Sequence, residues 1–217
     1  MFDFIFFDLD GTIVNSKEGV TTSVSYSLEK LNAPALNEET LEKFIGPPLV
    51  DSYIKYCGFD RNKALDAINK YREYYSVTGI YKFKLYDGIR EMLLSLKENG
   101  KKVYIATSKP EIYAKKILEK ANIIDLFDDV FGATFDSSRV KKQDVLKYAF
   151  SSLGLNDFSK TVLVGDTVFD VLGAKEVGIS SLAVTYGYEN EQSLVTSEPD
   201  FLVNSVAEII GFFCTKH

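Results

Sequence analysis

The chain has 217 residues, of which 46% are hydrophobic and 26% charged, and its net charge is −6 at neutral pH. This composition is typical of a globular protein and excludes disorder as the default. The acidic balance, without a dense run of Lys or Arg, argues against binding to a nucleic-acid polymer. The single histidine, His217, nearly excludes a His-based triad or a His-rich metal site, so carboxylates must carry any catalytic chemistry.

The cellular location is predicted from what the sequence lacks. No apolar stretch approaches the roughly 18 to 20 uncharged residues that a membrane span needs. The run Phe2–Phe7 is too short for a signal-peptide core and lacks a basic leader. Cys57 and Cys214 lie far apart in the sequence and suggest neither a disulfide framework nor a zinc cluster. We therefore expect a cytoplasmic protein with no membrane partner.

The first predicted elements are a strand and then a group of helices. The aromatic run Phe2–Phe7 favours a buried strand. From about residue 17 to residue 80, apolar residues recur at helical spacing, and the stretch shows no convincing strand signal. Breaks at 32–34, 46–48 and Gly58 are expected to be loops. The tyrosines at 71, 74 and 75 are expected to pack between these helices rather than to stack on a nucleobase.

Helices and strands alternate in the rest of the chain. Asp87 is predicted to cap a helix that ends before Gly100, and Pro110 to open a helix with Ile112, Lys116 and Ile117 on its buried stripe. The other predicted elements are strands over 103–106, 130–132, 161–165, 181–184 and 201–203, helices over 142–153 and 169–177, and a C-terminal helix. Such alternation predicts an α/β fold with a doubly wound parallel sheet. The helical stretch, residues 16–83, is then an insertion into a core domain of residues 1–15 and 84–217.

The first strand ends in two acids and a glycine. In a doubly wound sheet, ligands bind beyond the carboxyl ends of the strands. Asp8 and Asp10 would point to one side of an extended segment, while Leu9 points back into the fold. Two neighbouring carboxylates repel, so a cation between them or a raised pKa is required. The simpler interpretation is that Asp and Gly merely end the strand.

A second acidic pair follows the strand over 161–165. Asp170 lies four residues after Asp166 and can face the same site, although it can equally be an acid that starts a helix. Asp8, Asp10 and Asp166 together form an all-oxygen set that suits Mg²⁺ better than zinc.

Candidate phosphate ligands complete this pattern, because Mg²⁺ with few carboxylates usually binds a phosphate oxygen as well. Thr107 ends a strand just before a helix, where it can hold an anion or simply cap the helix. Lys142 lies on the core-facing stripe of its helix and needs a buried negative partner. Lys141 fits that stripe less well and stays as the alternative, with Lys109 as a third candidate.

In this order, the four motifs resemble the haloacid dehalogenase (HAD) superfamily of phosphohydrolases over essentially the whole chain. The motifs are Asp8-Leu9-Asp10-Gly11-Thr12, Thr107, Lys142, and Gly165-Asp166 with Asp170. The resemblance implies a Rossmann-like core with a small α-helical cap as the insertion. The chain is most similar to the phosphoglycolate-phosphatase-like group, which also includes 5′-nucleotidases and pyrophosphatases.

The resemblance also implies roles for single residues. Asp8 would be the nucleophile that forms an aspartyl-phosphate, and Asp10 would protonate the leaving oxygen and then activate water. Mg²⁺ would be bound by Asp8, the Asp10 backbone carbonyl and Asp166, with Asp170 positioning the site. The phosphoryl oxygens would be bound by Thr107, Ser108 and Lys142. The Pro-x-Pro that follows this lysine in relatives is missing here, which keeps Lys141 as an alternative.

The substrate is predicted only as a class. A mobile cap that excludes water favours a small phosphorylated metabolite over a phosphoprotein. Similar proteins place a specificity loop where this chain has Gly46-Pro47-Pro48-Leu49, although the segment can also be an ordinary helix connector. A monomer and a homodimer are both compatible with the sequence.

Other functions remain open at this stage. A phosphoacceptor receiver, which is a switch rather than an enzyme, also combines acids, Mg²⁺, a threonine and a lysine. The position of Asp8 on the first strand and the helical insertion argue against a receiver. A pyrophosphatase and a phosphosugar mutase belong to the same superfamily, but Thr12 after Gly11 favours a phosphatase over a mutase. A catalytically idle scaffold is disfavoured because all catalytic positions are filled.

Overall fold

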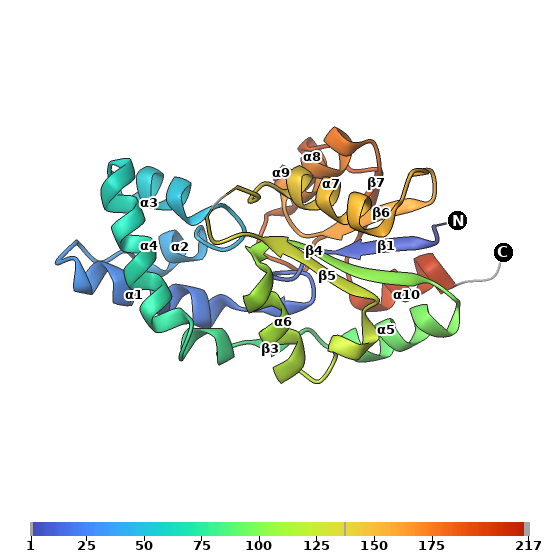
Figure 1. The fold of residues 1–217 in the computed structure, drawn as a ribbon, viewed down its shortest axis with the longest axis horizontal. Coiled ribbons are helices and arrows are strands. Elements are labelled where there is room, and N and C mark those ends of the chain that lie inside the picture. Colours follow the sequence, from blue (N-terminus) through green and yellow to red (C-terminus); the bar gives the residue numbers. More distant parts are fainter. Residues whose placement is uncertain (1, 137, 215–217) are drawn as a thin grey trace. The chain divides into compact units, whose positions relative to one another are not determined.

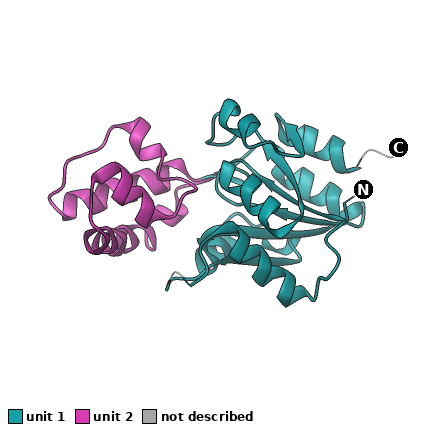
Figure 2. Ribbon diagram, turned by 90° about the horizontal axis from the view of Figure 1, so that it is seen from above, with its two compact units in different colours: residues 1–15, 85–217 teal, residues 16–84 magenta. Residues whose placement is uncertain are grey.

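The computed structural model of the protein describes residues 2–136 and 138–214. The chain divides into two compact units, which Figure 2 shows in different colours. The core unit comprises Met1–Asn15 and Leu85–His217, and the helical unit comprises Ser16–Lys84. Two short strands, β2 (Val14–Asn15) and β3 (Lys84–Leu85), pair with each other where the chain passes from one unit to the other.

The core unit is built on a six-stranded sheet in which the paired strands are parallel. The strand order is β5-β4-β1-β6-β7-β8. The strands are β1 (Phe4–Phe7), β4 (Lys102–Pro110), β5 (Asp129–Ala133), β6 (Thr161–Gly165), β7 (Ser180–Val184) and β8 (Phe201–Val203). The central strands are apolar and almost fully buried, as expected for a parallel sheet covered on both faces. The predicted α/β fold with a doubly wound parallel sheet is confirmed.

Helices cover both faces of this sheet (Figure 1). On one face lie α5 (Ile89–Glu98), α6 (Glu111–Lys120) and α10 (Val206–Cys214), and on the other α7 (Lys142–Leu153) and α8 (Val168–Val177). Shorter elements are η2 (Ile124–Leu126) and α9 (Glu191–Thr196), which packs beside α8. Strand β1 lies between β4 and β6. From β1, the strands β4 and β5 extend the sheet on one side, and β6, β7 and β8 extend it on the other. The strand order therefore reverses at β1, and such a switch point is where doubly wound sheets bind ligands.

The helical unit consists of α1 (Lys17–Lys30), α2 (Glu38–Glu42), α3 (Leu49–Cys57), α4 (Arg61–Tyr75) and η1 (Gly79–Tyr81). Tyr71 and Tyr75 are buried on α4, and the Tyr74 ring stacks on Tyr26 of α1. The predicted packing role of these tyrosines is confirmed. None of the helices that the structure describes, in either unit, is long and apolar enough to cross a membrane.

Two sequence predictions about helix starts were wrong. Helix α5 is capped by Gly88, whose φ of +83° is left-handed, and not by Asp87. Pro110 remains in β4 and α6 begins one residue later, and the buried face of α6 differs from the predicted stripe. Ile112 is 52% exposed and Lys116 is exposed, while the buried stripe is formed by Tyr113, Ala114, Ile117 and Leu118.

Candidate active site

The predicted site residues meet at the carboxyl ends of the three central strands. In the sheet register, Phe7 of β1 is level with Ile105 of β4 and with Val164 of β6. Asp8 and Asp166 directly follow β1 and β6, while Thr107 lies in the last part of β4, and all three side chains are buried. Motifs that are far apart in the sequence therefore lie side by side, because neighbouring parallel strands end at the same edge.

Three carboxylates form the centre of the site. One oxygen each of Asp8, Asp166 and Asp170 lies within 4.8 Å of the others, and all three residues are buried. Asp170 thus belongs to the group that could hold a metal ion. The Asp10 side chain is not part of this group, although its backbone carbonyl is the predicted ligand.

Lys142 lies between the carboxylates at the start of α7. Its Nζ is 2.8 Å from Asp8 Oδ1, 2.8 Å from Asp170 Oδ1 and 2.8 Å from the Ala106 carbonyl oxygen, to which it donates a hydrogen bond. The two carboxylate contacts are ion pairs without the directionality of a hydrogen bond. Burial by itself lowers the pKa of Lys142, but the charges of Asp170 and Asp8 outweigh burial and hold this pKa above its usual value.

The structure also distinguishes between the two neighbouring lysines. Lys141 is exposed and precedes the first turn of α7, whereas Lys142 is 4% exposed. The stem of Lys142 lies against Gly173 of α8, where an added Cβ would come within 2.7 Å of the lysine Cβ. This close packing of two helices directs the ammonium toward the carboxylates.

Asp166 is oriented by two donors from other parts of the chain. Thr12 Oγ1 donates to its Oδ1 at 3.1 Å, and the Tyr188 backbone N–H donates to its Oδ2 at 2.9 Å. Gly11 has a φ of +85°, and a Cβ at this position would lie 2.0 Å from Asp166 Oδ2. The glycine is therefore required both by its backbone conformation and by the space that the carboxylate occupies.

Asp170 combines the two roles that the sequence left open. Its Oδ2 accepts hydrogen bonds from the Thr167 backbone N–H at 3.0 Å and from Thr167 Oγ1 at 2.7 Å, as in a capping box. Its Oδ1 faces Lys142. Burial raises the pKa of the Asp170 carboxyl, the Lys142 ammonium opposes this effect and the Asp8 charge adds to it.

Thr107 and Ser108 lie in the last part of β4, at the sheet edge that carries the acids. Thr107 is buried, and its Oγ1 accepts a hydrogen bond from the Lys109 backbone N–H at 3.2 Å. Its hydroxyl hydrogen remains available as a donor for a ligand oxygen. Ser108 follows at a half-buried position.

The sequence did not predict the partner of Lys109. Its Nζ forms an ion pair with Asp10 Oδ2 at 2.8 Å, and the two side chains are only 7% and 11% exposed. The sequence feature that could have indicated this pairing is the position of Lys109 directly after Thr107 and Ser108. Because spacing along the chain does not show which acid such a lysine reaches, this pairing became visible only in the structure.

Two tyrosines from different segments also adjoin the site. Tyr186 donates its hydroxyl to the Thr12 carbonyl oxygen at 2.9 Å, and its ring packs edge-on against Tyr86. Burial, with the charges of Asp166 and Asp10 adding to it, raises the pKa of Tyr86 to about 12. Burial also raises the pKa of Tyr186, so both phenols stay protonated at neutral pH.

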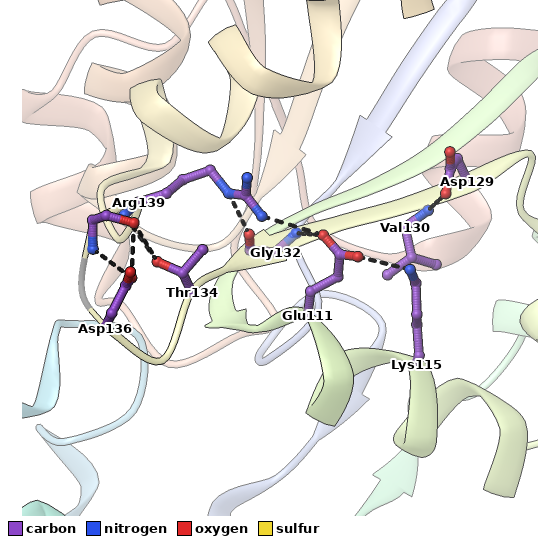
Figure 3. Close-up of polar contacts among 9 residues, drawn as sticks. Glu111, Lys115, Asp129, Val130, Gly132, Thr134, Asp136 and Arg139 are labelled. Carbon is purple, nitrogen blue, oxygen red and sulfur yellow. Dashed lines mark hydrogen bonds and ion pairs between the residues drawn. The ribbon is translucent and has the colours of Figure 1, made fainter. Parts of the chain in front are cut away.

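A second polar cluster holds the segment that leads into α7 (Figure 3). Arg139 Nε donates to the Gly132 carbonyl oxygen of β5 at 2.8 Å, and Arg139 Nη2 lies 3.4 Å from Glu111 Oε2 of α6. Glu111 also pairs with Lys115 at 2.7 Å. These contacts join β5, α6 and the residues before Lys142, so they support the backbone that carries this lysine.

The charge of the site fits a divalent cation. With all groups ionised, the four carboxylates Asp8, Asp10, Asp166 and Asp170 face two ammonium groups, Lys109 and Lys142, which leaves a net charge of −4 + 2 = −2. Burial, followed by repulsion from Asp170 and Asp8, raises the pKa of Asp166 well above its usual value. A divalent ion among Asp8, Asp166 and Asp170 would remove this repulsion, and a set of only oxygen donors suits Mg²⁺.

The predicted specificity loop lies in the helical unit. Gly46, Pro47 and Pro48 connect α2 to α3 and are half-buried, and Gly46 has a φ of +99°.

A family model described as haloacid dehalogenase-like hydrolase matches residues 5–184. The chain belongs to this family. It is 36% identical to a 5′-nucleotidase of Pseudomonas aeruginosa over 195 residues, which cover 90% of this chain and 88% of the relative. It is 35% identical to the tyrosine-protein kinase PtkA of Mycobacterium tuberculosis, with 85% of this chain and 62% of that longer protein covered.

Solved structures agree with this assignment. A crystal structure of a predicted phosphatase from Clostridium acetobutylicum superimposes with a TM-score of 0.94, at 38% identity and with 98% of each chain covered. The family and the hydrolase class predicted from the sequence are confirmed. This membership favours a HAD hydrolase over the receiver-type switch.

Proposed function

We propose that this HAD hydrolase is a Mg²⁺-dependent phosphatase that hydrolyses small phosphomonoesters through an aspartyl-phosphate on Asp8. The observation that carries the proposal is the pairing of each catalytic acid with its own lysine. Asp8 contacts Lys142, and Asp10 contacts Lys109. Two carboxylates in different environments at one sheet edge suit a nucleophile and a proton carrier. The partner is a small phosphorylated metabolite rather than a nucleic-acid polymer.

In the first step, a carboxylate oxygen of Asp8 attacks phosphorus and the bond from phosphorus to the leaving oxygen breaks. Asp10 gives its proton to that leaving oxygen. Within the residues that the structure describes, Asp10 Oδ1 is buried without a hydrogen-bond partner, while Oδ2 faces Lys109. Oδ1 is therefore the oxygen placed to hold the transferred proton.

In the second step, Asp10 is a carboxylate and takes a proton from water. The water oxygen attacks phosphorus, the bond between Asp8 and phosphorus breaks, and inorganic phosphate leaves. Lys142 stabilises the Asp8 carboxylate as it is released, because its Nζ lies 2.8 Å from Asp8 Oδ1. Thr107 and Ser108 donate to the phosphoryl oxygens.

Asp8, the Asp10 backbone carbonyl and Asp166 would hold Mg²⁺, with Asp170 positioning Lys142 and joining the acidic group. When bound, Mg²⁺ supplies charge neutralisation for the phosphoryl group. Thr12 and Tyr188 keep the Asp166 carboxylate oriented for this task. The helical unit would serve as the cap, with Gly46, Pro47 and Pro48 as its substrate loop.

The test is phosphate release from a panel of 2-phosphoglycolate, nucleoside 5′-monophosphates, sugar phosphates and pyrophosphate. We expect release with Mg²⁺, none with excess chelator, and a loss of at least about 10³-fold in Asp8→Asn, as for other lost nucleophiles. Asp125→Asn, at an exposed position of the core unit, is the matched control and should keep full activity. A wild-type protein that is folded but inactive on every substrate would contradict the proposal. A phosphoenzyme that persists for minutes would favour a switch instead.

A further inference from the structure

A short segment after β7 packs directly against Asp166, one of the carboxylates that could hold a metal ion. The segment is Tyr186-Gly187-Tyr188, and its three residues are half-buried. A Cβ on Gly187 would lie 2.2 Å from Asp166 Cβ and 2.3 Å from Asp166 Oδ2, so a larger residue does not fit there. The backbone N–H of Tyr188 donates to the same Oδ2 at 2.9 Å. The backbone of this segment therefore fixes one oxygen of Asp166.

The other oxygen of Asp166 is held by Thr12, and Thr12 is in turn held by Tyr186. Thr12 is fully buried, and its Oγ1 donates to Asp166 Oδ1 at 3.1 Å. The Thr12 carbonyl oxygen accepts a hydrogen bond from the Tyr186 hydroxyl at 2.9 Å. The same segment thus acts on both oxygens of Asp166, directly through Tyr188 and indirectly through Tyr186 and Thr12.

The hydrogen bond from Tyr186 is a second anchor for the turn that carries Thr12. In this turn the Leu9 carbonyl oxygen accepts from the N–H groups of Ile13 and Val14 at 2.9 Å each. The Thr12 N–H lies 3.4 Å from that oxygen, which is long for a hydrogen bond. Because the Tyr186 hydroxyl makes the shorter contact with Thr12, loss of this hydroxyl should let Thr12 move relative to Asp166.

The ring of Tyr186 is held independently of its hydroxyl. It packs edge-on against Tyr86, with 5.0 Å between the ring centroids. The Tyr86 backbone N–H donates to the Ile13 carbonyl oxygen at 3.3 Å. Since the ring contact does not require the hydroxyl, Tyr186→Phe removes the bond to Thr12 and keeps the packing.

The orientation of Asp166 matters because the acids around it repel one another. Asp166 shares the acidic group with Asp8 and Asp170, and repulsion favours a carboxylate that turns away from such neighbours. An ionised carboxylate has about four lone-pair positions. Thr12 and Tyr188 each occupy one of them, so both oxygens can still bind a cation. A carboxylate that is already oriented binds a metal ion more tightly than one that must first be ordered.

We propose that Tyr186 is a positioning residue for the divalent cation. By holding the Thr12 carbonyl oxygen, its hydroxyl keeps the Thr12 side chain on Asp166 and so raises the affinity of the site for Mg²⁺. This inference rests on the Mg²⁺ site of the proposed function, and it adds a residue that acts through Thr12 rather than on the metal or the substrate.

The experiment measures Mg²⁺ binding by the full chain in the absence of substrate. The free energy of unfolding in urea is followed as MgCl₂ replaces NaCl at constant ionic strength, and its dependence on Mg²⁺ gives the Kd. We expect the Kd of Tyr186→Phe to be about 10- to 100-fold higher than that of the wild type, as for other residues that orient metal ligands. The Mg²⁺ concentration that half-saturates phosphate release should rise with it, while kcat at saturating Mg²⁺ changes far less. Tyr148→Phe removes a hydroxyl at an exposed position of the core unit, and this control should keep the wild-type Kd.

A double-mutant cycle tests the route through Thr12. Thr12→Val removes the donor to Asp166, whereas Thr12→Ser retains it and should keep most of the affinity for Mg²⁺. If Tyr186 acts through Thr12, the double variant with Tyr186→Phe should bind Mg²⁺ no more weakly than Thr12→Val alone. Losses of affinity that simply add would overturn the inference.

Two other results would overturn it in different ways. An unchanged Kd in Tyr186→Phe, with stability lowered equally at every Mg²⁺ concentration, would show that the hydroxyl supports only the fold, and the proposed Mg²⁺ site would stand. A folded wild type that Mg²⁺ does not stabilise would overturn the Mg²⁺ dependence of the proposed function and this inference together.

Discussion

The two units of this protein bury very different interiors. The helical unit packs apolar and aromatic side chains, such as Phe44, Tyr53 and Phe59, and its buried hydroxyl pair, Ser27 and Tyr53, is neutral. The core unit buries four carboxylates and two lysines at one sheet edge. Charges in such a position cost free energy unless they are paired, so this edge is maintained at the expense of stability.

The difference separates the residues that perform chemistry from those that hold the fold. Loss of a buried group in the helical unit should change stability by the value of a lost contact. Loss of a charged side chain in the core site should change both stability and activity. For Asp166→Asn, stability should rise while activity is lost.

The largest effect is expected for Lys142→Met. Removal of the ammonium leaves Asp8 and Asp170 as neighbouring buried carboxylates without their shared cation. We expect the free energy of unfolding to fall by about 3–5 kcal/mol in chelator, as for other broken buried ion pairs. Activity should fall by at least about 10³-fold, measured under conditions in which the variant is folded.

The matched control is Lys147→Met on the same helix. Lys147 is exposed and lies 3.8 Å from Glu176, so its loss should cost less than about 1 kcal/mol. Similar stability of both variants in urea titrations would contradict the buried ion-pair arrangement.

Mg²⁺ should stabilise the wild-type protein. The site has a net charge of −2 with all groups ionised, and a ligand at about 100 times its Kd adds roughly 2.7 kcal/mol to the free energy of unfolding. The measurement is urea unfolding in MgCl₂ and in NaCl of equal ionic strength. Equal stability in the two salts would show that no divalent ion binds the folded protein.

Asp166→Asn should separate stability from function. An asparagine can still accept from the Tyr188 N–H and can donate to the Thr12 hydroxyl, while one buried negative charge is removed. Without Mg²⁺ we expect a variant that is more stable than wild type by about 1 kcal/mol, because buried repulsion is relieved. The stabilisation by Mg²⁺ and the activity should both be lost.

The control for this variant lies in the helical unit. Asp66→Asn changes an exposed aspartate of α4 and should leave unfolding, Mg²⁺ response and activity unchanged. A chelator-treated Asp166→Asn protein less stable than wild type would contradict the repulsion argument.

The smallest effect is expected for Tyr53→Phe in the helical unit. The variant loses the hydroxyl contact with Ser27, while Ser27 keeps its bond to the Val24 carbonyl oxygen. We expect a loss of about 1 kcal/mol in the free energy of unfolding with kcat unchanged. Tyr56→Phe on the same helix, at a half-buried position, should be nearly neutral. A large fall in kcat for Tyr53→Phe would contradict a purely structural role for the interior of the helical unit.

Much of the fold was predictable because it depends on local patterns. The strand over 161–165 and the helix over 142–153 coincide with β6 and α7, since uninterrupted apolar runs and glycine stops leave little choice. The predictions failed where an element boundary depends on neighbours. Pro110 continues β4 because that strand pairs with β5 up to Ala133, and the sequence around the proline gives no sign of this pairing.

The sequence by itself determined which residue types meet at the sheet edge, since the alternation of strands and helices predicts a parallel sheet and ligands bind beyond the carboxyl ends of its strands, where Asp8, Thr107 and Asp166 stand. Only the tertiary structure decided how charges pair there. Lys142 reaches Asp8 and Asp170 because α7 packs against Gly173 of α8, and Lys109 reaches Asp10 because β4 and β1 are neighbouring strands. Which side chains form an ion pair depends on the distance between packed elements in space. That distance cannot be calculated from the spacing of the residues along the chain.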